Sequence, residues 1–180
     1  MVEVGVCIDA ADHDNGPLMV VPGSHRGPVY DHHADGIFYG TVSAKEIGPR
    51  LAEAVPLLAP AGSITIHHVR MLHGAGANLS QRPRRFLLMG YSAADAWPLS
   101  AFGGADASYF QDAMVCGTAA PVARMEALPV RLPLPLPPVT SLYEIQRGHP
   151  DRLYTQTAAE LEGLRATGLT ADRLPRSQGS

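Results

Sequence analysis

The sequence predicts an all-β domain of the sandwich or jelly-roll type, and three observations lead to it. Apolar and polar residues alternate in short runs, which is the period of a strand with one buried face. The 180 residues include 16 prolines and 18 glycines, which favour many turns and short strands over a helical bundle. The runs do not alternate with long helical segments, which argues against a parallel sheet.

The first half of the chain supplies most of the expected strands. Residues 2–8 alternate valine and isoleucine with Glu3, Gly5 and Cys7, and an Asn15-Gly16 turn leads to a short apolar strand at 17–21. Residues 63–68 form a second alternating strand, in which Ile64, Ile66 and His68 share one face and Ser63, Thr65 and His67 the other. A brief strand is expected at 70–73 and a longer one at 85–91.

The segments between these strands are expected to be irregular. Residues 27–40 are predicted as a polar loop, and Pro22-Gly23-Ser24-His25-Arg26 as the break that precedes it. Ser43 followed by Glu46 predicts a helix N-terminus, and Gly48 and Pro49 keep that helix short.

The signals weaken beyond residue 94, and two regions are separated at residue 127. Residues 1–127 are expected to hold the β domain, with helical turns near 109–115. Residues 128–180 are expected to form a proline-rich extended segment over 128–139 and a C-terminal tail, with a strand at 141–146 and a short helix at 157–167.

Composition excludes several classes of function. Charged residues make up 17% of the chain and the formal net charge is −3, so the basic stripe of a nucleic-acid-binding protein is missing. An apolar run of about 18 residues, which would predict a membrane span, is not found. Cys7 and Cys116 are predicted to be reduced core thiols, and a cytoplasmic location is expected.

The stretch from Arg70 to Arg85 carries the strongest functional signal. His73 precedes a glycine-rich bend, and Arg84 and Arg85 follow it as the chain returns to an apolar run. A neutral imidazole and a guanidinium facing one cavity suit a divalent metal and a carboxylate ligand. By itself, a histidine between turn glycines also fits a capping or loop residue, so both interpretations stay open at this point.

Three segments together resemble the phytanoyl-CoA dioxygenase family. They read Asp-Asn-Gly-Pro-Leu-Met-Val-Val-Pro-Gly-Ser-His-Arg at 14–26, Ala-Gly-Ser-Ile-Thr-Ile-His-His at 61–68 and Leu-His-Gly-Ala-Gly-Ala-Asn-Leu-Ser at 72–80, followed by Arg84. The resemblance implies a double-stranded β-helix, a form of jelly roll, over 1–127. It also implies an iron(II)- and 2-oxoglutarate-dependent oxygenase that hydroxylates a small organic substrate.

The resemblance also assigns site residues. It implies that His73 is the second histidine of the iron site and that Arg84 grips the far carboxylate of 2-oxoglutarate. Asn78 and Ser80 lie where polar co-substrate contacts are expected, although a turn that binds its own backbone explains them equally well. Arg85 is expected to face solvent, because adjacent strand residues point opposite ways.

The other two iron ligands of the family form an HxD motif one strand before the Asn15-Gly16-Pro17-Leu18 segment. Because this chain begins within the following strand, we expect it to be the C-terminal part of a longer β-helix, incomplete at its N-terminus. His33-Ala34-Asp35 is a minority alternative for that motif, since its place in the chain differs. His67 and His68 with His73 could imitate a zinc site, but neighbouring strand histidines point apart.

These observations leave two main hypotheses of function. The first is the oxygenase, and the alternative is a catalytically inactive β-helix domain that binds 2-oxoglutarate or a partner through Arg84 without iron. A zinc hydrolase is disfavoured, since no HExxH pattern is present. Losing core strands would leave open sheet edges, so we expect the chain made alone to be poorly soluble or a homo-oligomer. The sequence does not identify the substrate.

Overall fold

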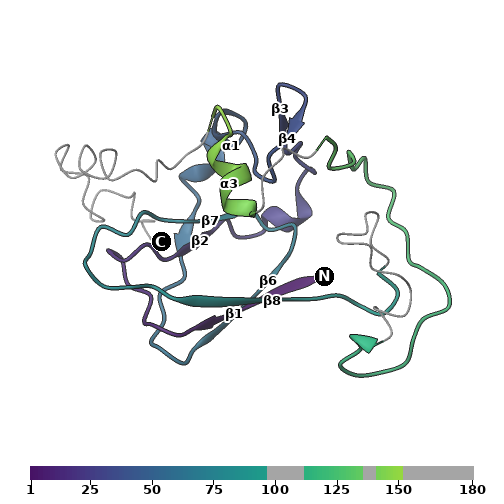
Figure 1. Cartoon of the computed structure of the whole chain (residues 1–180), viewed down its shortest axis with the longest axis horizontal. Coiled ribbons are helices and arrows are strands. Elements are labelled where there is room, and N and C mark those ends of the chain that lie inside the picture. Colours follow the sequence, from purple (N-terminus) through teal and green to yellow (C-terminus); the bar gives the residue numbers. More distant parts are fainter. Residues whose placement is uncertain (97–111, 136–140, 152–180) are drawn as a thin grey trace, which may run out of the picture.

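The protein is mainly β in the computed structural model, which describes residues 1–96, 112–135 and 141–151. Its two larger sheets each have three antiparallel strands. In the first, β1 (Val2–Cys7) lies between β6 (Ile64–His68) and β8 (Phe86–Tyr91). In the second, β2 (Leu18–Val20) lies between β5 (Val55–Pro56) and β7 (His73–Ala75). Figure 1 shows β2 and β7 above the β6–β1–β8 sheet.

The alternation at 2–8 is confirmed as a strand, but its buried side is the side of Gly5 and Cys7. Both residues are buried, whereas Ile8 is exposed. The aromatic ring of Phe86 occupies the place where a side chain at Gly5 would stand. Glycine is therefore needed here for space, since the ring of β8 covers the backbone of β1.

The pairing register fixes which side chains share each face of this sheet. Glu3 lies opposite His67 and Gly90, and Gly5 lies opposite Thr65 and Leu88. Because paired residues in an antiparallel sheet point to the same side, Thr65 and His67 share the face of Gly5 and Cys7. We call this the inner face. The outer face carries Val2, Val4, Val6, Ile64, Ile66, His68, Leu87, Met89 and Tyr91.

The segment expected as an irregular loop contains a small hairpin. Strands β3 (His33–Ala34) and β4 (Ile37–Phe38) pair with each other, and the turn between them has positive φ at Asp35 (50°) and Gly36 (78°). Such φ values at two consecutive central residues match a two-residue hairpin turn. The prediction of an irregular loop was therefore wrong at this point, because the apolar Ile37 and Phe38 supply one strand.

Two helices lie near this hairpin in Figure 1. Helix α1 (Ala44–Leu51) begins at Ser43, whose Oγ accepts a hydrogen bond from the amide of Lys45, so the predicted helix start is confirmed. Helix α3 (Leu142–Arg147) replaces the strand expected at 141–146. Ser141 caps it by accepting from the amide of Glu144, the capping arrangement that the strand prediction overlooked.

Other expectations about the chain had mixed outcomes. The brief strand expected at 70–73 begins only at His73, since residues 70–71 form a turn in which the amide of Met71 donates to the carbonyl of His68. Both cysteines are free as predicted, but Cys116 is exposed and not a core thiol. Residues 112–135 form no strand, and Arg131 pairs with Asp31 just before β3, while the carbonyl of Pro135 accepts a hydrogen bond of 3.1 Å from the amide of Phe38 on β4. The extended conformation of 128–139 stays a prediction.

Several predictions are not tested by the described residues. The helix at 157–167, the tail after residue 173 and the first part of the helical turns near 109–115 lie outside them, while Met114 and Val115 are described and are not helical. The boundary between the two regions at residue 127 also stays a prediction. Strands β6 and β8 end the first sheet and β5 and β7 end the second, so edges for self-association exist, but the oligomer itself stays a prediction.

Candidate metal and co-substrate site

His73 is held at the start of β7 by a buried loop residue. Ser24, in the 3-10 turn at Ser24–Arg26, is 1% exposed, and its Oγ accepts a hydrogen bond of 2.8 Å from the amide of Leu72. The carbonyl of Leu72 accepts from the amide of Val21 at 2.9 Å. These bonds fix the residue immediately before His73, and pairing with Val20 on β2 fixes His73 itself.

The imidazole of His73 is oriented for ligation. Its Nδ1 lies 2.7 Å from the carbonyl oxygen of Met71, so the proton of the neutral ring is placed on Nδ1. This arrangement leaves the lone pair of Nε2 available for a metal ion, as in histidines whose second nitrogen donates to a backbone carbonyl. His73 is exposed, so ligands can reach that nitrogen.

His67 faces His73 from the first sheet. The ring centroids are 5.0 Å apart, and His67 is only 6% exposed. Neither ring nitrogen of His67 has a hydrogen-bond partner in the part of the chain that the structure describes. Burial lowers the pKa of His67, the neighbouring His73 lowers it further, and Glu3 partly opposes them. The ring is therefore neutral near pH 7, with one donor and one acceptor both unused.

His68 lies on the opposite side of the same strand. Its ring approaches that of His25 at 5.5 Å between centroids, and its Nδ1 accepts from the amide of Arg70 at 3.1 Å. Adjacent strand histidines therefore point apart, as expected, and His25 belongs to the His68 side. Among residues 1–96, 112–135 and 141–151, no three His, Cys, Asp or Glu side chains gather closely enough to hold a metal ion.

The alternative HxD sequence sits on the β3–β4 hairpin. Nδ1 of His33 pairs with the carboxylate of Asp31, while Asp35 is exposed at the tip of the turn. Burial lowers the pKa of the neighbouring His32, the carboxylate of Asp31 partly opposes this, and His33 and His73 lower it further. His33 and Asp35 do not combine with His73 into a ligand set in the described structure.

Three arginines follow the glycine-rich bend, and their partners differ. Arg85 forms a two-pronged ion pair with Asp9, with distances of 2.8 Å from both Nε and Nη2, and Arg82 pairs with Asp12 and Asp14. Arg85 is exposed, as expected from strand alternation. Arg84 has no carboxylate partner among the described residues. Its guanidinium lies 5.8 Å from the ring centroid of Phe86.

The contact of its guanidinium with Phe86 places Arg84 beside the inner face, because the pairing of Phe86 with Cys7 puts that ring on the inner face. Arg84 is half-buried, and none of the described carboxylates compensates its charge. A guanidinium in this position can accept a carboxylate through two parallel hydrogen bonds.

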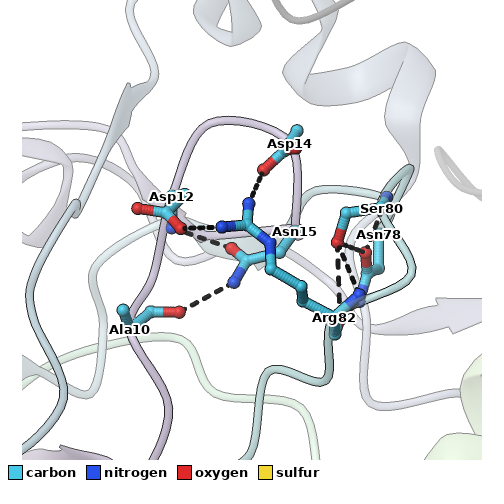
Figure 2. Close-up of polar contacts among 7 residues, drawn as sticks. All are labelled: Ala10, Asp12, Asp14, Asn15, Asn78, Ser80 and Arg82. Atoms are coloured by element: carbon cyan, nitrogen blue, oxygen red, sulfur yellow. Dashed lines mark hydrogen bonds and ion pairs between the residues drawn. The ribbon is translucent and has the colours of Figure 1, made fainter.

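Asn78 and Ser80 shape the turn that precedes Arg84 (Figure 2). Oδ1 of Asn78 accepts from the amide of Ser80 at 2.9 Å and from its hydroxyl at 2.8 Å, and Nδ2 of Asn78 donates to the carbonyl of Arg82 at 2.7 Å. These are the contacts of the turn interpretation. A direct contact of Asn78 or Ser80 with a co-substrate stays a prediction.

A second loop holds this turn in place. Asn15 is buried, its Nδ2 donates to the carbonyl of Ala10, its Oδ1 accepts from the amide of Asp12, and it forms a β-bridge with Asn78. Figure 2 shows Arg82 reaching across to Asp12 and Asp14 on that loop. Gly16 approaches the carbonyl of Gly76 so closely, at a φ of 75°, that only glycine fits. The three aspartates of this loop thus neutralise Arg82 and Arg85 and leave Arg84 free of a described ion pair.

The chemistry of these residues suits iron and 2-oxoglutarate only in part. The imidazole of His73 is of the type that ligates iron and the guanidinium of Arg84 of the type that binds a carboxylate, while the described residues do not supply three protein ligands. Sequence reasoning missed Ser24, which positions His73; the Pro-Gly-Ser-His segment was interpreted only as a strand break. The described residues contain no helix long and apolar enough to cross a membrane.

Comparison with known proteins finds the same family. Residues 1–86 match the model of the phytanoyl-CoA dioxygenase family, the family that the sequence resembles. It is 39% identical over 156 residues to a probable alpha-ketoglutarate-dependent hypophosphite dioxygenase of Stutzerimonas stutzeri, covering 84% of this chain and 54% of the relative. It is also 28% identical over 99 residues to the peroxisomal phytanoyl-CoA dioxygenase of Rattus norvegicus, covering 51% of this chain and 28% of that protein. The chain thus spans about half or less of these relatives.

Solved structures show weaker similarity. EvdO2 from Micromonospora carbonacea var. aurantiaca complexed with 2-oxoglutarate is 34% identical with a TM-score of 0.35, covering 48% of this chain and 36% of that one. EctD from S. alaskensis with bound Fe is 24% identical with a TM-score of 0.38, covering 48% and 30%. TM-scores this low support no conclusion about fold or function.

Proposed function

We propose that this chain forms part of an iron(II)- and 2-oxoglutarate-dependent dioxygenase that acts on a small molecule. In this proposal His73 is a metal ligand and Arg84 binds the far carboxylate of 2-oxoglutarate. The two three-stranded sheets would then be parts of a double-stranded β-helix. The family match over residues 1–86 and the bacterial relative support the reaction class.

The observation that carries the proposal is the state of Arg84. Of the three arginines that follow the bend, it is the one without a carboxylate partner among the described residues, and it lies beside the inner face eleven positions after His73. A half-buried guanidinium costs free energy unless an anion compensates it. A dicarboxylate such as 2-oxoglutarate would supply that anion and leave its 2-oxo acid end for the metal.

The chemistry proposed for bound iron(II) is that of 2-oxoglutarate-dependent dioxygenases. When iron(II) is bound, it would couple the conversion of 2-oxoglutarate and dioxygen into succinate and carbon dioxide to the insertion of one oxygen atom into the substrate. The residues of this chain would hold the two ends of the reacting assembly. Nδ1–H of His73 would fix the ring, and Arg84 would fix the co-substrate.

An anaerobic titration tests the proposal. Iron(II) is added to the chain with 2-oxoglutarate present, and the visible charge-transfer band of the chelated metal is recorded. We expect a band that His73→Ala abolishes and that His13→Ala, a change at an exposed loop histidine, leaves intact. No band in a well-folded sample would show that this chain by itself does not bind the pair, as the inactive-domain hypothesis requires.

A further inference from the structure

The inner face of the β6–β1–β8 sheet carries polar atoms that the site described so far does not use. Five buried side-chain nitrogen and oxygen atoms lack a hydrogen-bond partner among the described residues. Three of them lie on β6: Oγ1 of Thr65 and both ring nitrogens of His67. Leaving such groups unpaired costs free energy, so their presence in one strip points to a partner beyond the described residues.

The strip is directed toward the candidate metal ligand. Thr65 and His67 are two residues apart on one strand and therefore point to the same side. The ring of His67 lies beside that of His73, with the centroids 5.0 Å apart and the ring planes tilted by 57°. A ligand bound beside the metal-facing nitrogen of His73 would therefore meet His67 first and Thr65 behind it.

The surroundings limit the size of that ligand. The ring of Phe86 covers Gly5 in the middle of the inner face, so the centre of the sheet is already filled. The carboxylate of Glu3 leans over Gly90 of β8, with Oε1 3.2 Å from the place of a Cβ there, and its charge also acts on His67, the pKa of which it raises. What remains beside β6 is a short strip of hydroxyl and imidazole groups.

We propose that His67 and Thr65 form the substrate-binding wall of this site and that the substrate is a small oxyanion. The proposal rests on the oxygenase function above and adds the substrate class to it. The N–H of the neutral His67 ring and the hydroxyl of Thr65 would donate to oxygen atoms of the substrate. An alkyl chain would leave these groups unpaired and would compete with Phe86 for space.

Hypophosphite is a suitable probe, and NMR of the imidazoles provides a readout that needs no iron. The chain is labelled with nitrogen-15 at its histidines, and hypophosphite is titrated in at constant ionic strength with 2-oxoglutarate present to occupy Arg84. We expect the ring signals of His67 to shift with saturation, while those of the exposed His13 stay fixed. Sodium chloride at equal ionic strength should leave both unchanged.

Paired variants separate hydrogen bonding from shape. His67→Phe keeps a ring of similar volume without donors and should weaken hypophosphite binding about tenfold or more, while His67→Gln keeps an N–H donor and should stay within about threefold. Thr65→Val should weaken binding several-fold and Thr65→Ser should not. Ile66→Val on the outer face is the matched control.

The outcomes distinguish this inference from the proposed function. Unchanged affinity in His67→Phe overturns the inference, as does a His67 response that 2-oxoglutarate removes. Loss of the iron and 2-oxoglutarate band in both His67 variants would show that His67 ligates metal, which also overturns it. An absent band in the unmodified chain combined with intact hypophosphite binding at His67 would overturn the oxygenase proposal and leave an oxyanion site.

Discussion

The two faces of the β6–β1–β8 sheet differ in a way that composition does not suggest. The outer face is the apolar one, yet Ile64, Ile66 and Leu87 on it are 60%, 63% and 51% exposed. The inner face carries Glu3, Thr65 and His67 beside Phe86 and the exposed Leu88, and it holds the buried residues Gly5, Cys7 and His67. Isoleucine is thus exposed on the outer face while a histidine is buried on the inner one.

This difference indicates which face of the sheet is the candidate binding surface. Burying unpaired polar groups and exposing isoleucine both oppose folding, so neither is expected of a face selected only for stability. A polar interior beside His73 is the pattern of a binding site built at the expense of stability. The outer face is a contiguous apolar surface of the kind that marks contacts with other protein segments. The following variants test the contrast between the faces.

The largest effect is expected at Arg84. Arg84→Met should weaken 2-oxoglutarate binding about 100-fold or more, since removing one partner of a desolvated charge pair costs about 2–5 kcal/mol. Arg85→Met is the matched control, because Arg85 is exposed and already paired with Asp9, and it should change the affinity about twofold at most. The iron-dependent charge-transfer band, titrated with 2-oxoglutarate, measures both. Equal losses in the two variants would remove the distinction between the faces.

His73 and Arg84 could be predicted from the sequence because their signal is local. A histidine, a glycine-rich bend and an arginine eleven positions later lie within one short segment. The sequence could not predict that Arg84 lacks a described ion pair. Its lack of a partner depends on three aspartates, about 70 positions away in the chain, that pair with Arg82 and Arg85. Contacts at that separation leave no pattern in a single sequence.

The strands were predicted better than the orientation of their faces. Alternation predicted strands at 2–8 and 63–68, which the structure has at 2–7 and 64–68, but the assumption that apolar side chains point inward fails on this sheet. The ring of Phe86 over Gly5 decides which side is buried, and that contact joins residues 81 positions apart. Short elements such as β5 and the β3–β4 hairpin have too few residues to show any period.

A side chain at Gly5 should have the next largest effect. Gly5→Ala places a methyl group within the ring of Phe86, and overpacking of this kind costs about 1–3 kcal/mol of unfolding free energy. Ile66→Thr on the outer face should change it by about 0.5 kcal/mol or less, since that side chain is 63% exposed. Urea unfolding measures both. The double variant Gly5→Ala/Phe86→Leu should recover part of the loss, and an additive result would contradict the steric cause.

Ser24 tests how firmly His73 is held. Ser24→Ala removes the acceptor of the Leu72 amide in a buried position and should lower the unfolding free energy by about 1–2 kcal/mol. It should also weaken iron binding several-fold without changing the position of the band, because the ligand remains but its placement loosens. Ser63→Ala, immediately before β6, is the control and is expected to leave iron binding unchanged. A Ser24→Ala variant with normal iron affinity would show that β2 pairing alone positions His73.

The smallest effect concerns the ion pair beside the inner face. Hydrogen bonds from Arg85 lower the pKa of Asp9 to about 2 from an ordinary value of 3.8. Because the folded-state pKa is the lower one, Asp9 contributes stability that is present above pH 3.8 and is lost as the pH falls toward 2. Asp9→Asn should therefore melt slightly below the unmodified chain at pH 6, and the gap should close between pH 4 and pH 2. Other carboxylates titrate in both proteins and cancel in the difference. A gap that stays constant with pH would assign the effect of Asp9 to its backbone contact with the amide of Arg85, which an asparagine oxygen can still accept.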